Sequence, residues 1–192
     1  MIHIKPDIRA QRSAKLLYDG LVEVLKTKDF NKITISDISK ASTVGRATFY
    51  RNFDEIIDLL YWKCSTGFQE VLTRFNQSDP DLTQEDEILV FVLRYWMSSD
   101  NLKVLEILMD IGRLDIIYNS FVDNANILID YLKMRGVSMS TDDFTYFISV
   151  RAGFFVGIIR AWIVNGKKET PEQVSNIILR QHEDVINARL II

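Results

Sequence analysis

Apolar residues recur along this chain at intervals of three and four, the spacing of one face of an α-helix. No stretch of note alternates between apolar and polar residues as a half-buried β-strand does, and the sequence has no internal repeat. The pattern therefore predicts an all-α protein of about nine helices. They are expected at 9–26, 35–42, from 46 onward, 55–75, 84–98, 102–110, 114–133, 142–164 and 171–187. The clearest break between them is expected at 77–83.

Two of the predicted helices are short and follow one another in the N-terminal quarter of the chain. In the first, Thr34 stands at the N-cap and Asp37 three residues later, which is the spacing of a capping box. Residues 43–45 interrupt the pattern, and the second helix begins at Arg46. Two short helices joined by a three-residue turn predict a helix-turn-helix, in which the second helix enters the major groove of DNA.

The second short helix carries side chains whose chemistry suits DNA. Arg46 and Arg51 can pair with guanine edges or phosphates, and Tyr50 can donate to a phosphate oxygen. Phe49 and Phe53 are better interpreted as core aromatics than as DNA contacts. The predicted contact set, in which Thr34 reaches a phosphate from the start of its helix, is Thr34, Arg46, Thr48, Tyr50 and Arg51.

Charge is distributed unevenly along the chain. The first 53 residues hold ten Lys and Arg against five Asp and Glu, a formal charge of +5. Because the whole chain carries −3, the remaining residues carry −8. A basic N-terminal segment on an acidic body is the distribution expected of a DNA-binding domain joined to a regulatory domain, although an ordinary fluctuation of surface charge gives the same numbers.

Residues 34–53, TISDISKASTVGRATFYRNF, resemble the DNA-binding domain of the TetR family of bacterial transcriptional regulators, whose pattern is roughly T-V-x-D-I-A-x-A-A-G-V-S-x-G-T-F-Y-x-Y-F. The positions that match in register are Thr34, Ile35, Asp37, Ile38, Ala41, Val44, Thr48, Phe49, Tyr50 and Phe53. Residues 154–171, FFVGIIRAWIVNGKKETP, are similar to the pattern G-x-I-x-x-W-L-x-N-G-x-K-E-x-P of one C-terminal subclass, which includes a dihydroxyacetone-kinase coactivator.

The resemblance implies a DNA-binding domain at 1–53 and a helical domain at 54–192 that binds an effector and dimerises. It implies a ligand-responsive repressor that binds a palindromic, double-stranded DNA operator as a homodimer, with a small-molecule effector of unknown identity. In this family the last two long helices form a four-helix dimer interface. The alternative is that both helices only complete the monomer core. The residues expected at the interface are Phe147, Val150, Phe154, Gly157, Ile158, Ala161, Ile177 and Ile178.

Aromatic and sulfur-bearing residues of the larger domain are candidates for an effector pocket. Their simpler interpretation is ordinary core packing. A pocket formed by a subset of them would favour a flat or apolar small molecule. The candidate pocket residues are Trp62, Phe91, Tyr95, Trp96, Met109, Tyr118 and Phe155.

The sequence departs from the family pattern at positions that bear on DNA affinity. Within the motif, two expected glycines and one expected serine are replaced by Thr43, Ala47 and Gly45. The lysine that typically opens the next helix and contacts phosphate aligns with Ile56, preceded by Asp54 and Glu55. Carboxylates at this point predict a weaker phosphate contact. They leave open a second function, in which the same fold serves as a coactivator that binds protein rather than DNA.

Composition excludes several other classes. Cys64 is the only cysteine, and the chain lacks both an apolar signal core and an uncharged run of about 18 residues, so we expect a cytoplasmic protein without a membrane span. The two histidines lie near opposite ends of the sequence. With no metal-ligand spacing, glycine-rich phosphate loop or nucleophile motif, we expect neither an enzyme nor a bound cofactor or metal.

Overall fold

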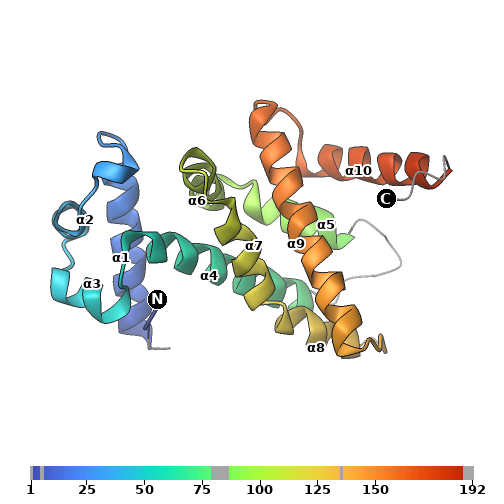
Figure 1. The fold of residues 1–192 in the computed structure, drawn as a ribbon, viewed down its shortest axis with the longest axis horizontal. Helices are drawn as coiled ribbons and strands as arrows, with labels where there is room; N and C mark the ends of the chain where they lie inside the picture. Colours follow the sequence, from blue (N-terminus) through green and yellow to red (C-terminus); the bar gives the residue numbers. More distant parts are fainter. Residues whose placement is uncertain (1, 5–6, 79–86, 135, 188–192) are drawn as a thin grey trace. The chain divides into compact units, whose positions relative to one another are not determined.

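The computed structural model describes residues 2–4, 7–78, 87–134 and 136–187, and these residues form an all-α fold, as predicted (Figure 1). Within them the chain forms ten α-helices, one short 3-10 helix and no strand beyond an isolated antiparallel bridge between Ile2 and Phe53. The helices are α1 (Ile8–Val24), η1 (Phe30–Lys32), α2 (Ile35–Ser42), α3 (Arg46–Asn52), α4 (Ile56–Gln77), α5 (Glu87–Trp96), α6 (Ser99–Asp110), α7 (Leu114–Asp123), α8 (Asn126–Met134), α9 (Thr141–Val164) and α10 (Pro171–Asn187).

The helix expected at 114–133 is two helices, α7 and α8, and this accounts for ten helices instead of nine. Asn124 separates them: its side-chain amide donates to the carbonyl of Ser120 at 2.7 Å, in the place of the backbone hydrogen bond of a continuing helix. Its backbone N–H bonds to Phe121 instead, at 3.2 Å, which tightens the last turn. The apolar period continues across this break, so periodicity alone did not reveal it.

The break expected at 77–83 begins where α4 ends, at Gln77. Residues 79–83 of that break, and residues 84–86 of the helix expected after it, lie outside the described residues. The chain divides into two compact units, Met1–Thr66 and Gly67–Ile192, and α4 contributes residues to both. The domain boundary expected after Phe53 stays a prediction.

The first unit is built around the close packing of α1 against α2. Leu17 and Leu21 of α1 and Ile38 of α2 are fully buried. Gly20 makes the approach possible, because a Cβ atom there would lie 2.7 Å from the Cβ of Ser42 and 2.9 Å from its backbone nitrogen. The position of α2 on α1 therefore depends on the absence of a side chain at residue 20.

The second unit has an aromatic core. The ring of Phe68 on α4 lies 4.7 Å from Trp96, 5.2 Å from Phe121 and 5.4 Å from Phe155, measured between ring centroids. Gly67 lets the Trp96 indole reach the α4 backbone, since a Cβ there would lie 2.5 Å from the ring. We call Phe68, Trp96, Phe121 and Phe155 the aromatic cluster. It joins α4, α5, α7 and α9 into one core.

The second sequence pattern that resembles the family, at 154–171, forms the corner between α9 and α10. The indole N–H of Trp162 donates to the carbonyl of Glu169 at 2.9 Å, and the backbone N–H of Lys167 donates to the carbonyl of Trp162 at 2.9 Å. Thr170 and Gln173 then cap α10 reciprocally, each accepting from the other's backbone N–H, at 3.3 and 2.9 Å. The pattern thus fixes where α10 begins after α9.

Candidate nucleic-acid interface and the exposed face of α9

The start of α2 has the predicted capping box. The Thr34 hydroxyl accepts from the backbone N–H of Asp37 at 3.2 Å, and the Asp37 carboxylate accepts from the Thr34 N–H at 2.8 Å. Lys28 adds an ion pair to the same carboxylate at 2.6 Å. Hydrogen bonds from Lys28 and Thr34 hold the pKa of Asp37 well below its usual range, so the cap stays ionised. The Thr34 hydroxyl also donates to Asp37, at 2.7 Å, so its proton is engaged within the box.

The start of α3 is, by contrast, open. Gly45 is its N-cap and supplies no side-chain hydrogen bond, and the first turn contains no acidic residue. The φ of Gly45 is −64°, an ordinary value for any residue, and a Cβ there would meet nothing within 4 Å. The first backbone N–H groups of α3 therefore face no side-chain acceptor of their own helix, which suits the approach of an anion.

The turn between α2 and α3 carries backbone strain. Thr43 has a φ of 60° and a ψ of 12°, in the left-handed region. A β-branched residue adopts this region at a cost, and glycine is the residue that adopts it freely. This is the position where the family pattern has glycine.

The structure places the candidate DNA contacts on one short helix and at the start of its neighbour. Arg46 and Arg51 are exposed, Tyr50 is 58% exposed, and Thr48 is half-buried. Phe49 lies in the core beneath them, fully buried as predicted, and so does Phe53. Arg46 makes a long hydrogen bond of 3.4 Å to the Ser36 hydroxyl, and Arg51 has no partner among the described residues.

The start of α4 is acidic and already occupied. The Asp58 carboxylate accepts from the backbone N–H groups of Asp54 and Glu55, at 3.0 Å each. The Asp54 carboxylate lies 3.0 Å from Nε2 of His3. The helix end that would bind a phosphate is therefore filled by the protein's own carboxylate. The sequence analysis singled out Asp54 and Glu55 but missed Asp58, although an acidic residue in a first helical turn is a recognised capping signal.

One face of α9 is buried and the opposite face is not. The buried residues, Ile148, Ala152, Phe155, Ile159 and Trp162, recur every three or four positions, and α9 packs on α7. On the other side Val150 is 65% and Phe154 is 50% exposed. Both are large apolar side chains without cover among the described residues.

The residues expected at a dimer interface lie on or beside this exposed face. Val150, Phe154, Gly157 and Ala161 are exposed, and Phe147, Ile158, Ile177 and Ile178 are half-buried. A Cβ at Gly153 or Gly157 would meet nothing within 4 Å, so the centre of the face is flat. Tyr146 and Val164 extend the same face and were missed, although they continue the three-to-four spacing. We call Tyr146, Val150, Gly153, Phe154, Gly157, Ala161 and Val164 the α9 face.

The candidate pocket residues lie in several different surroundings. Trp96 and Phe155 belong to the aromatic cluster, and the Tyr95 hydroxyl donates to Glu70 at 2.7 Å. Trp62 packs on Phe53 in the first unit, with ring centroids 6.5 Å apart. The remaining three, which are half-buried, are Phe91, Met109 and Tyr118.

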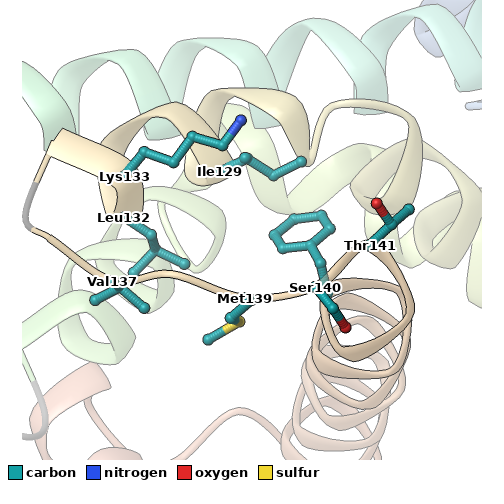
Figure 2. A pocket seen from close by; sticks show the side chains of 8 residues that line it. Ile129, Leu132, Lys133, Val137, Met139, Ser140 and Thr141 are labelled. Carbon is teal, nitrogen blue, oxygen red and sulfur yellow. The ribbon is translucent and has the colours of Figure 1, made fainter.

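A cavity of about 150 Å³ does occur in the second unit, between α8 and the start of α9 (Figure 2). Figure 2 shows side chains from α8 on one side and from the following loop on the other, and none of the seven candidate pocket residues lines it. Lys133 is the one cation among its lining residues. The full lining is Ile129, Leu132, Lys133, Val137, Met139, Ser140, Thr141 and Phe144.

No reactive centre emerges from the described residues. The Cys64 side chain is fully buried, and burial raises the pKa of its thiol, which makes it a poor nucleophile. Within the described ranges, no three His, Cys, Asp or Glu side chains gather in a group that could hold a metal ion.

Residues 114–183, which include α7, α8, α9 and most of α10, match a protein family described as a transcriptional regulator C-terminal region of the TetR type. This C-terminal region of the chain is similar to that of TetR-type transcriptional regulators. A comparison with curated protein sequences gave no match. Proteins of the TetR regulator family are typically not enzymes.

Two of the solved structures that match have the fold of this chain. One is the crystal structure of Lin0861 from Listeria innocua, with a TM-score of 0.76 and 21% sequence identity, over 96% of this chain and 98% of that chain. The other is DhaS, described as a dihydroxyacetone kinase operon activator, with a TM-score of 0.56 and 19% identity, over 88% of this chain and 95% of that chain. Both likenesses concern the fold.

By length and composition alone, α9 could cross a membrane. Only 28% of its most apolar 18-residue window is buried within the chain. α9 lies within the matched region and packs on α7 through one face.

Proposed function

We propose that this protein is a homodimer that binds a palindromic DNA operator through α3 and represses transcription there. One observation carries the proposal: α3 is anchored by the fully buried Phe49 while Arg46, Tyr50 and Arg51 remain exposed on the same short helix. A helix that is anchored in the core by one side chain and exposes arginine and tyrosine to solvent is suited to binding in the major groove.

In the proposed complex Arg46 and Arg51 pair with guanine edges or phosphates, and Tyr50 donates to a phosphate oxygen. Thr48 contacts the DNA from the same helix. Thr34 contacts a phosphate from the start of α2, for which its hydroxyl turns away from Asp37. Two such helices meet successive turns of the groove, about 34–36 Å apart, only if two chains associate.

The α9 face supports the proposed association. It combines exposed Val150 and Phe154 with a flat centre at Gly157, where nothing lies within 4 Å of an added Cβ. Close approach of a second copy of this face would remove apolar side chains from water. Ile177 and Ile178 are the α10 residues expected at the interface. They follow the corner between α9 and α10, which the hydrogen bond from Trp162 holds in place.

We further propose that a small-molecule effector, bound in the unit Gly67–Ile192, shifts the dimer between two states that differ in operator affinity. α4 contributes residues to both units, which makes it the natural element for transmitting such a shift. The candidate pocket residues named from the sequence, Trp96 and Phe155 among them, are retained as a proposal.

A second candidate function is supported by the start of α4. Asp54, Glu55 and Asp58 place three carboxylates where a phosphate contact is expected, and Asp58 fills the helix end. A protein of the same fold that acts through a protein partner, without binding DNA, would tolerate this charge. The fold likeness to an operon activator keeps this coactivator function as the alternative.

DNA binding by the full chain distinguishes the two functions. Labelled duplexes from the region upstream of the gene are titrated with protein, and fluorescence anisotropy is measured at several salt concentrations. The proposal predicts binding that depends on sequence and weakens with salt. Absence of such binding would remove the repressor function and favour the coactivator.

Substitution of the α3 arginines tests the contact assignment. Arg46→Ala and Arg51→Ala are each expected to weaken operator binding by about 1–3 kcal/mol for each of the two half-sites, roughly 5- to 150-fold per half-site. Lys32→Ala is the matched control, because it removes one exposed positive charge that is already paired with Asp29 at 2.8 Å. If both arginine variants keep wild-type affinity, α3 is not the contact helix.

A further inference from the structure

The basic side chains of the unit Met1–Thr66 fall into two groups, according to whether a carboxylate neutralises them. Four lysines form ion pairs of 2.5–2.8 Å with Asp or Glu: Lys15, Lys26, Lys28 and Lys32. The four arginines of the unit have no carboxylate partner among the described residues: Arg9, Arg12, Arg46 and Arg51. Lys40, at the end of α2, is also unpaired within the described chain. Among the described residues of this unit, the positive charge without a carboxylate partner is therefore mainly arginine.

Two of the unpaired arginines lie outside α3, on the first turns of α1. Arg9 and Arg12 are three residues apart, so they project from the same side of the helix, and both are exposed. The neighbouring Ile8 is 87% exposed, which shows that no described segment covers this part of α1. Asp7, the nearest acid in sequence, caps α1 by accepting from the N–H of Ala10 at 2.8 Å.

The chain ahead of α1 is attached to the end of α3. The backbone N–H of His3 donates to the carbonyl of Asn52 at 2.8 Å, and Ile2 bridges to Phe53. Six residues beyond His3 the chain reaches Arg9, so the two are at most about 20 Å apart. α1 and α3 also pack against each other, and Figure 1 shows the start of α1 near the end of α3.

This placement has a consequence for a helix bound in the major groove. The groove is about 12 Å wide and is bordered on each side by a phosphate backbone. A long arginine side chain that lies close to the end of that helix can approach the bordering phosphates. The start of α4 cannot serve the same purpose, because Asp58 occupies it and Asp54 and Glu55 repel an anion.

We propose that Arg9 and Arg12 form a second phosphate-binding site beside α3, which supplies the backbone contact that the acidic start of α4 does not make. This site presupposes the DNA-binding function proposed above. A guanidinium pairs with a phosphate through two parallel N–H donors, and the contact is independent of base sequence. Arg9 and Arg12 thus contribute affinity for any duplex, whereas Arg46 and Arg51 contribute the choice of operator.

The test is the salt dependence of binding by the double variant Arg9→Ala/Arg12→Ala, measured in the full chain. Each phosphate contact contributes about 0.9 to the slope of log K against log salt. Because the proposed dimer carries two copies of the site, the double variant loses four contacts, which is expected to reduce that slope by about 3.6 and to weaken operator and scrambled duplexes by a similar factor, about tenfold or more at low salt. The ratio between the two duplexes should stay unchanged.

Two further variants isolate the arginines from simple changes in charge. Arg9→Lys/Arg12→Lys keeps both cations and should retain most of the slope. Lys15→Ala/Lys26→Ala removes the same net charge from α1 and its end, but from side chains already paired with Asp19 and Glu23, and should leave the slope unchanged. Thermal unfolding by circular dichroism confirms that each variant is folded.

The possible results distinguish failure of this phosphate-binding site from failure of the proposed DNA-binding function. If the wild type binds its operator and the double alanine variant has the same slope and affinity, Arg9 and Arg12 do not contact phosphate. An equal loss in Lys15→Ala/Lys26→Ala also contradicts the site, because it would indicate a general charge effect. If the wild type binds no DNA at any salt concentration, the proposed function itself is wrong and this site is excluded with it.

Discussion

The two compact units expose different chemistry, and each exposes what its proposed partner would cover. In Met1–Thr66 the exposed side chains of α1 and α3 include four arginines without carboxylate partners among the described residues. In Gly67–Ile192 the uncovered side of α9 carries Val150 and Phe154 around a flat centre. Unpaired arginines suit a polyanion, and a flat apolar face suits a second apolar surface. The proposed functions of the two units therefore follow from their exposed surfaces, which are charged in one and apolar in the other, more than from their buried cores.

The units also differ in whether hydrogen bonds and ion pairs offset the strain of a residue with positive φ. Thr43 in the first and Lys167 in the second both have positive φ, of 60° and 56°. Lys167 gains an ion pair with Glu106 at 2.5 Å and a backbone hydrogen bond to Trp162. Among the described residues Thr43 has no comparable bond. The strain is compensated at the α9–α10 corner and remains uncompensated in the turn before α3.

The largest effect is expected when a charge is introduced into the apolar α9 face. Phe154→Glu places a carboxylate in the α9 face, and burying an unpaired charge there should weaken self-association by at least about 100-fold. Sedimentation velocity across a range of protein concentrations measures the change. Lys168→Glu, on the exposed loop after α9, is the control and should associate as the wild type does. A Phe154→Glu dimer of unchanged affinity would remove α9 from the interface.

A second substitution is expected to destabilise the unit Met1–Thr66, which carries the unpaired arginines. Gly20→Ala forces α1 away from α2, because the new Cβ would lie 2.7 Å from that of Ser42. We expect a loss of about 1–3 kcal/mol in the free energy of unfolding, measured in urea. Gly45→Ala adds the same methyl group where nothing lies within 4 Å and should cost less than about 1 kcal/mol. Equal effects of the two would contradict the close contact at Gly20.

Removing the strain at Thr43 should produce a smaller effect of opposite sign. Thr43→Gly is expected to stabilise the chain by about 1 kcal/mol, since the left-handed conformation costs a β-branched residue roughly that amount. Lys167→Gly is the matched comparison and should bring no gain, because it also removes the ion pair with Glu106. Urea midpoints at constant slope measure both. A stabilised Lys167→Gly beside an unchanged Thr43→Gly would reverse the comparison.

The smallest expected effect concerns the open start of α3. Gly45→Ser supplies the missing N-cap hydroxyl and should stabilise the chain by a few tenths of a kcal/mol. The same hydroxyl lies where the family pattern has serine, so operator affinity should rise or stay equal. Anisotropy titration of the variant beside the wild type measures it. A clear loss of affinity would show that the backbone at Gly45 itself approaches the DNA.

Local features of the fold were predictable from the sequence, because their causes are local. The capping box of Thr34 and Asp37 follows from spacing alone, and so does the burial of Phe49 behind the exposed arginines. The helix break at Asn124 was missed because it depends on one side-chain hydrogen bond rather than on the apolar period. The expected helices elsewhere agree with the structure to within a few residues of their ends, apart from the residues that are not described.

The candidate sites were less accessible to prediction. Asp58 follows two other acids, and only the backbone shows that its carboxylate closes the start of α4. Residues of the aromatic cluster such as Trp96 have the composition of a pocket but the packing of a core, and composition does not separate the two. The unpaired state of Arg9 and Arg12 depends on which carboxylates the neighbouring lysines take, which is a property of the folded unit.

The central claim is that a dimer of this chain recognises DNA by sequence. The most direct test is sedimentation velocity of a labelled upstream duplex with the full chain at about 0.15 M salt, beside a scrambled duplex of equal length. We predict a complex of two chains on the upstream duplex and little or none on the scrambled one. No complex on either duplex, or the same complex on both, would contradict the account.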